Sequence, residues 1–176
     1  MNIEQRLTNN RTAGRDGRKA VAVVEHVMAG TLDGTDAWFH NHTSSASAHF
    51  GVGRDGRVFQ WVELQDTAWH AGDYDHPNTA LALVTMGWQQ RLPANLWTVG
   101  VEHEGNTGDG LTPVQFATTV QLHLFIKAEL ERLGVGYLQF TPQTLLQHAH
   151  VNSATRAGCP GTGFPMASLF GALKGA

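Results

Sequence analysis

The side chains of this 176-residue sequence that are best suited to bind a metal are its ten histidines and its single cysteine. His26 ends an apolar, strand-like stretch, and His148 and Cys159 lie near each other, joined by an irregular segment. Zinc binds imidazole nitrogen and thiolate sulfur readily, and catalytic zinc sites use three protein ligands plus water. The residue types therefore allow a catalytic zinc site, although the spacing matches no zinc-finger pattern.

Cys159 is open to other interpretations. A single cysteine cannot form a disulfide within the chain, so Cys159 is a buried inert thiol, a nucleophile or a metal ligand. As a nucleophile it would use His148 or His150 as its base. His150 also competes as a ligand, but in an extended segment its side chain would point away from that of His148.

Glu102 is a candidate general base. With Glu104 it flanks His103 at the end of an apolar, strand-like stretch, so the two glutamates share one face and His103 takes the other. A carboxylate at the end of a buried strand is costly unless it is paired or functional. Glu102 could therefore act on a metal-bound water. The alternative is a solvated strand end with two surface glutamates.

Three further polar side chains lie close to apolar strands or to Cys159. Arg156 precedes Cys159 by three positions and could stabilise a developing oxyanion, or could lie on the surface. His49 and His70 adjoin strand-like stretches, where each could be structural or functional.

Several strand-like stretches would position these residues. Residues 19–24 lead to His26, and residues 97–104 carry Glu102. Residues 47–53 and 58–62 flank Asp55-Gly56, a pair typical of a two-residue hairpin turn. Because α/β folds place their sites at the ends of strands, we expect the chemistry there.

The clearest helix is predicted from Pro113 to Leu133. Thr112 is its expected N-cap, Gln115 completes a capping box, and Gly134 ends it. Shorter helices are expected over residues 35–41 with Thr35 as cap, near residues 79–88, and after Pro165.

Strands and helices are mixed and two strands form a hairpin. We therefore predict an α/β fold, a single domain with a mixed central β-sheet flanked by helices. Residues 1–19 are expected to form an N-terminal arm, and residues 20–176 the catalytic domain.

Composition excludes several classes of function. The chain is 41% hydrophobic and 15% charged, which is typical of a soluble globular protein. Its net charge of −3 argues against a nucleic-acid-binding surface. No apolar run approaches the roughly 20 residues of a membrane span. The N-terminus has no apolar signal region, so we expect no signal peptide.

Five segments, taken in order, resemble the zinc-dependent N-acetylmuramoyl-L-alanine amidase family, which includes phage endolysins and peptidoglycan recognition proteins. The similarity covers roughly residues 20–170. Each segment is weak alone, but their shared order is specific. The segments are the strand ending in His26, Ser47-Ala-His-Phe with its Arg-Asp-Gly hairpin, Ala68-Trp-His-Ala-Gly, Val99-Gly-Val-Glu, and His148 through Arg156 to Cys159-Pro-Gly.

The resemblance implies roles for individual residues. Zinc would be bound by His26, His148 and Cys159, and Glu102 would be the acid/base residue. The resemblance also suggests that Arg156 lies near the scissile carbonyl. From the residue types, we expect Arg156 or His70 to stabilise the oxyanion. We expect the substrate to contact His49, Trp69 and Trp61, with Trp38 as a further candidate, although at least one tryptophan is expected in the core. The chain departs from many members at Ala157, where they carry lysine, and from some at Ala48, where they carry tyrosine.

The implied activity is cleavage of the amide bond between N-acetylmuramic acid and the L-alanine of the peptidoglycan stem peptide by zinc-activated water. Two alternatives remain: a non-catalytic muropeptide-binding module of the same fold, and a cytoplasmic anhydro-muropeptide amidase of cell-wall recycling. The expected partner is peptidoglycan or a muropeptide, with no nucleic acid and no membrane insertion, and the expected state is a monomer. A phage endolysin would reach the cell wall from the host cytoplasm; otherwise the protein would be cytoplasmic.

Overall fold

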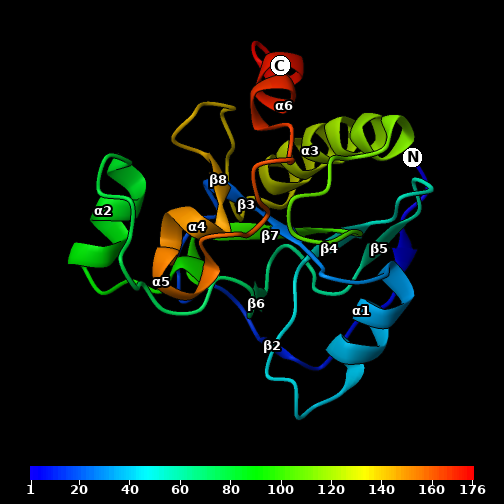
Figure 1. The fold of residues 1–176 in the computed structure, drawn as a ribbon. Coiled ribbons are helices and arrows are strands. Elements are labelled where there is room, and N and C mark those ends of the chain that lie inside the picture. The colour runs from blue at the N-terminus through cyan, green and yellow to red at the C-terminus, as the bar shows by residue number, and fades with distance from the viewer.

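The computed structural model describes residues 1–176 and contains one main β-sheet with helices packed around it (Figure 1). The sheet has six strands in the order β1-β5-β4-β7-β3-β8. All neighbouring strands are parallel except β4 and β5, which form the hairpin. This confirms the predicted mixed sheet. The strands are β1 (Glu4–Gln5), β3 (Ala22–Val27), β4 (Phe50–Val52), β5 (Val58–Gln60), β7 (Thr98–His103) and β8 (Leu145–Gln147). A separate antiparallel pair consists of β2 (Arg11–Thr12) and β6 (Thr67–Ala68).

The helices differ greatly in length, and the longest covers one face of the sheet. Figure 1 shows that longest helix, α3, above the sheet with α6 next to it, and α1 below. The helices are α1 (Leu32–His40), α2 (Ala82–Gln89), α3 (Pro113–Leu133), α4 (His148–Val151), α5 (Ser153–Arg156) and α6 (Met166–Leu173), with a 3₁₀ turn η1 at Ala94–Leu96. No helix is both long and apolar enough to cross a membrane.

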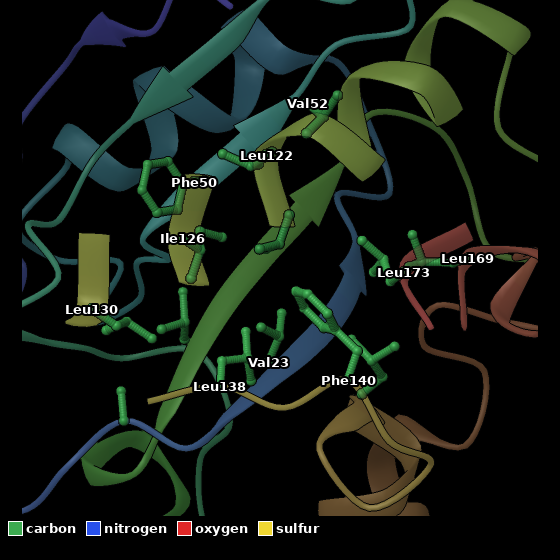
Figure 2. Packing of buried hydrophobic residues seen from close by; sticks show 14 of the residues in the cluster. Val23, Phe50, Val52, Leu122, Ile126, Leu130, Leu138, Phe140, Leu169 and Leu173 are labelled. Atoms are coloured by element: carbon green, nitrogen blue, oxygen red, sulfur yellow. The ribbon is translucent and has the colours of Figure 1, made fainter. Parts of the chain in front are cut away.

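Helix α3 forms as the sequence predicts. The Thr112 side chain accepts a hydrogen bond from the backbone of Gln115, whose side chain completes the capping box, and Gly134 ends the helix with φ of 65°. Buried residues of α3 such as Leu122 and Ile126 belong to the main core together with Phe50 of β4 and Val23 of β3 (Figure 2). Close packing of this kind holds the strands of the sheet in fixed positions.

Side chains alternate between the two faces along the central strands. Val23 belongs to the core beneath α3, whereas Ala22 and Val24 belong to a second core on the other face. Val99 and Val101 of β7 likewise point towards α3. By this alternation, His26 and Glu102 share the face opposite α3.

Several element boundaries differ from the predictions. Helix α1 begins at Leu32 and not at residue 35, because the Thr31 side chain caps it by accepting a hydrogen bond from the Gly34 N–H. Strand β3 continues to Val27, because it pairs with β7 over its whole length. Helix α2 starts at Ala82, a few residues later than expected.

The hairpin is confirmed, but its turn is longer than a two-residue turn. The Gly53 N–H donates to the Arg57 carbonyl oxygen, so three residues lie between this pair. The Gly56 N–H donates back to Gly53, and Gly56 has φ of 86°. A turn followed by glycine in the left-handed region is the common three-residue hairpin loop, and it uses the same Asp-Gly pair.

Residues 1–19 lie against the rest of the chain. Strand β1 is the edge strand beside β5. Arg15 is 4% exposed, and its guanidinium donates to the carbonyl oxygens of Leu64 and Thr98. The division into an arm and a catalytic domain at residue 19 stays a prediction.

Candidate metal and catalytic site

Three side chains from distant parts of the sequence meet at one end of the central strands. His26 lies near the end of β3, His148 begins α4 directly after β8, and Cys159 follows α5. Because β8 is paired in parallel with β3, the chain reaches His148 at the same end of the sheet as His26. The Ala149 N–H donates to the Cys159 carbonyl oxygen, which holds the Cys159 loop against α4.

The potential ligand atoms of these residues converge on one point. One ligand atom from each of His26, His148 and Cys159 lies within 4.8 Å of the other two. The two Nδ1 atoms of His26 and His148 are 3.0 Å apart, and Cys159 Sγ is 3.9 Å from His26 Nδ1. His148 Nε2 is 3.2 Å from the Ala71 carbonyl oxygen, to which it donates its proton, leaving the Nδ1 lone pair free to bind a metal.

Burial keeps both imidazoles neutral near pH 7. It lowers the pKa of His26 well below its usual 6.5, and the neighbouring His148 and His70 act in the same direction. Burial also lowers the pKa of His148 to about 4, against the effect of its hydrogen bond to Ala71. Neutral imidazoles are the form that binds metals. The donor set and its protonation therefore fit a metal site.

Glu102 faces the same site from the next strand. It is directly opposite His26 in the β3–β7 register. Its Oε2 atom is buried and has no hydrogen-bond partner. Burial raises the pKa of Glu102 to about 8, and the Arg156 guanidinium acts in the opposite direction. An unpartnered buried carboxyl beside a metal site is suited to exchanging a proton with a reacting molecule.

A cavity of about 540 Å³ opens over these residues. Its lining includes the three potential ligands, Glu102, His70 and Arg156. Helix α1 forms another part of the wall, where the Trp38 side chain is exposed, and Trp69 also lines the cavity. The cavity thus joins metal-binding, acid/base and aromatic side chains in one space of the size that ligand sites have.

A comparison with known families agrees with this arrangement. A family model described as N-acetylmuramoyl-L-alanine amidase matches residues 16–162, most of the chain. The chain belongs to this amidase family.

Individual relatives are similar over part of their length. The chain is 30% identical over 89 residues to N-acetylmuramoyl-L-alanine amidase A of Achromobacter lyticus, covering 50% of this chain and 39% of that protein. It is 29% identical over 102 residues to the 1,6-anhydro-N-acetylmuramyl-L-alanine amidase AmpD of Haemophilus influenzae, covering 55% and 48%. The matched region thus spans less than half the length of either curated relative.

Solved structures share the fold of this chain. A crystal structure of a selenomethionine AmpD derivative matches with a TM-score of 0.72 at 20% identity, covering 98% of this chain and 94% of that one. The structure of PlyL matches with a TM-score of 0.68 at 13% identity, covering 99% and 98%. These likenesses show that the whole chain adopts this fold.

Two residues predicted to contact substrate lie outside the cavity. His49 is fully buried, accepts a hydrogen bond from the Gly100 N–H, and lies 2.8 Å from an Arg15 nitrogen. Trp61 is fully buried in the core beside α1 and donates to Asp36. Neither side chain lines the cavity, and this placement argues against direct contact with a substrate. Both residues instead support the elements around the site.

His150 takes a different position from the one predicted. The segment after β8 is the helical turn α4 and not an extended strand, so the argument from strand alternation was wrong. His150 Nδ1 accepts a hydrogen bond from the Gln147 N–H and caps that turn. Because its Nδ1 is used within the turn, His150 is not part of the cluster of ligand atoms.

The sequence analysis named Trp38 as a candidate substrate contact but missed the rest of the wall formed by α1 and the preceding loop. Thr31, Thr35 and Trp38 line the cavity together with residues 28–30. Their spacing places them on one side of a helix, and this signal was available in the sequence. It was overlooked because the helix was expected to begin only at Thr35.

Proposed function

We propose that this chain is a zinc-dependent N-acetylmuramoyl-L-alanine amidase that hydrolyses the amide bond between N-acetylmuramic acid and L-alanine of the stem peptide. The observation that carries the proposal is the convergence of His26, His148 and Cys159 beside Glu102 in one cavity. Membership of the amidase family supports the choice of substrate bond.

Zinc is the metal that this donor set fits best. Two imidazoles and one thiolate are three protein ligands, the number that catalytic zinc sites use while leaving one position open. With zinc–nitrogen distances of roughly 2.0–2.1 Å, two nitrogens of a tetrahedral site lie about 3.3 Å apart. The 3.0 Å between the two Nδ1 atoms is close to this spacing.

Glu102 is the proposed general base and acid. A zinc ion bound by the three ligands supplies Lewis acidity, which polarises a carbonyl group and makes water more acidic. The Glu102 carboxylate takes the proton of the attacking water and then delivers it to the nitrogen of the departing L-alanine. Burial raises the pKa of Glu102 to about 8, and a cation held by the neighbouring ligands would favour its ionised form.

Arg156 is proposed to stabilise the negative charge that develops on the carbonyl oxygen. It lines the cavity and forms no salt bridge with a protein carboxylate, so its guanidinium is free to bind an anionic oxygen. The sugar and peptide of the substrate would lie against Trp69 and Trp38, because aromatic faces pack well on sugar rings.

A metal-free cysteine hydrolase is disfavoured by the environment of Cys159. Burial raises the pKa of the Cys159 thiol to about 11. A nucleophilic cysteine requires the opposite shift, because the thiolate is the reactive form.

The direct test is to measure release of stem peptide from purified cell walls together with the metal content of the protein. We expect about one zinc per chain, loss of activity on chelation and recovery with added zinc. Full activity without metal would refute the zinc mechanism. A zinc-loaded protein that binds muropeptide but releases nothing would instead be a binding module.

The physical form of the substrate is a separate question. The Haemophilus influenzae relative is named for 1,6-anhydro-N-acetylmuramyl-L-alanine. Rates on intact sacculi and on soluble anhydro-muropeptides should be compared under the same conditions. Preference for sacculi would indicate a lytic enzyme, and preference for the soluble fragment would indicate cell-wall recycling.

A further inference from the structure

His70 lies between a metal ligand and the central sheet, and both of its ring nitrogens are engaged. His70 Nδ1 is 3.0 Å from His26 Nε2. On the other side of the ring, His70 Nε2 is 3.2 Å from the hydroxyl oxygen of Thr98. The Thr98 hydroxyl is in turn 2.7 Å from the carbonyl oxygen of Ala94. These contacts form a continuous series of hydrogen bonds from η1 to His26.

The Ala94 carbonyl oxygen, at one end of this series, determines the direction of every hydrogen bond in it. A carbonyl oxygen can only accept, so the Thr98 hydroxyl donates to Ala94 and its lone pair accepts from His70 Nε2–H. A neutral His70 with its proton on Nε2 has a lone pair on Nδ1. That lone pair accepts from His26 Nε2–H, which leaves the lone pair of His26 on Nδ1. Nδ1 is the atom that faces His148 and Cys159.

The surrounding backbone fixes the position of the His70 ring. The N–H groups of His70 and Ala71 both donate to the Asn95 side-chain oxygen, at 3.2 and 2.8 Å. The ring lies directly on Gly100, where an added Cβ would come within 2.5 Å of His70 Cγ. The ring is therefore held from its backbone and from the strand beneath it.

We propose that Thr98 and His70 position His26 for metal binding by fixing its tautomer and the orientation of its ring. His70 is then a positioning residue. Stabilisation of the oxyanion is left to Arg156, because neither ring nitrogen of His70 has a free N–H to donate. This inference rests on the proposed metal site, but not on the identity of the amide that is cleaved. Groups that orient a ligating histidine typically contribute 10–100-fold to metal affinity.

The test uses two substitutions of nearly equal shape, His70→Asn and His70→Leu. Asparagine can place its side-chain oxygen near the position of His70 Nδ1 and accept from His26, whereas leucine cannot accept. Zinc affinity is measured by competition with a chromophoric chelator, and the site geometry by the absorption spectrum of the cobalt-loaded protein. We expect His70→Leu to bind zinc about 10–100-fold more weakly than wild type, with an altered cobalt spectrum. We expect His70→Asn to stay closer to wild type in both measurements.

A second measurement requires no substitution and so covers the case in which a variant fails to fold. Nitrogen-15 NMR of the histidine rings in the wild-type protein should show His70 and His26 both as neutral rings protonated on Nε2. A proton on His70 Nδ1 would overturn the proposal. Equal zinc affinity of wild type and a folded His70→Leu protein would overturn it as well. The proposed amidase activity can fail without this inference. In that case no stem peptide is released, but His70→Asn and His70→Leu still differ in zinc affinity and in cobalt spectrum.

Discussion

At the scale of single residues, Glu102 is distinguished from the neighbouring glutamate by its surroundings. The Oε2 atom of Glu102 has no partner and lies beside the cavity. Glu104 comes directly after the end of β7, where its Oε2 accepts a hydrogen bond from the Arg54 N–H, and it does not line the cavity. Sequence alternation groups the two glutamates together, and only the fold separates their roles.

This difference provides a matched pair of substitutions. Glu102→Gln should retain zinc and lower kcat about 10²–10⁴-fold, because the amide cannot take the proton from water. Glu104→Gln should retain nearly full activity. The measurement is the turnover rate on a defined muropeptide, with the zinc content of each protein determined in parallel. Normal turnover by zinc-loaded Glu102→Gln would show that another group is the base.

The three candidate ligands named from the sequence converge in the structure, but their spacing along the chain did not explain why. His26 and His148 are 122 positions apart and His26 and Cys159 133 apart, so spacing alone could not bring them together. Their order within the family pattern provided that information. His49 and Trp61 show the limit of the approach, because a ring beside a strand packs equally well in a core or in a groove.

At the scale of elements, strand β3 serves the site on one face and the core on the other. Glu25, next to His26, points towards α3 and lies 2.6 Å from His123 Nε2, with both side chains fully buried. His103 of β7 occupies the same layer, and its Nδ1 donates to the His26 carbonyl oxygen. The sequence analysis missed this cluster, because Glu25 and His123 are 98 positions apart and neither belongs to a motif.

The Glu25–His123 pair should contribute strongly to the packing of α3 on the sheet. Burial lowers the pKa of His123, but the Glu25 carboxylate outweighs it, so the net pKa is raised. His123→Gln removes the cation and leaves Glu25 buried without a charged partner. We expect it to lower the free energy of unfolding by about 3–5 kcal/mol, measured by urea denaturation. A loss below 1 kcal/mol would show that the pair is not ionic in the folded protein.

The same pair predicts a pH dependence of stability. A histidine whose pKa is raised by folding contributes its full stabilisation below its unfolded pKa of about 6.5 and loses it as the pH rises through the folded value. The free energy of unfolding of the metal-free wild type should therefore exceed that of the Glu25→Gln/His123→Gln double variant at low pH. This excess should shrink as the pH rises above about 6.5. Urea unfolding of both proteins from pH 5.5 to 9 measures this difference. A constant difference across that range would contradict the ionic pair.

At the scale of the whole molecule, the proposed metal site joins three segments of the chain, the first of which lies far from the other two in the sequence. The ligands come from β3, which lies between β7 and β8 in the sheet, from α4, and from the loop between α5 and α6 (Figure 1). An unfolded chain cannot bring these side chains together at low cost, because closing such long loops loses conformational entropy. A metal that needs all three ligands therefore binds the folded state and stabilises it.

This linkage predicts that zinc raises the thermal stability of the wild type and that the increment depends on each ligand. At a free zinc concentration 100 times the dissociation constant, binding adds about 2.7 kcal/mol. For a chain of this size that corresponds to an increase in Tm on the order of 5–10 °C.

Cys159→Ser should fold in the metal-free state with a Tm near that of metal-free wild type, because the substitution changes one atom at a half-buried position. It should show a much smaller increase with zinc, because a hydroxyl is a far weaker zinc ligand than a thiolate. The comparison requires four melting curves, each protein with chelator and with zinc. An equal increase in both proteins would place the stabilising zinc elsewhere on the molecule and remove Cys159 from the site.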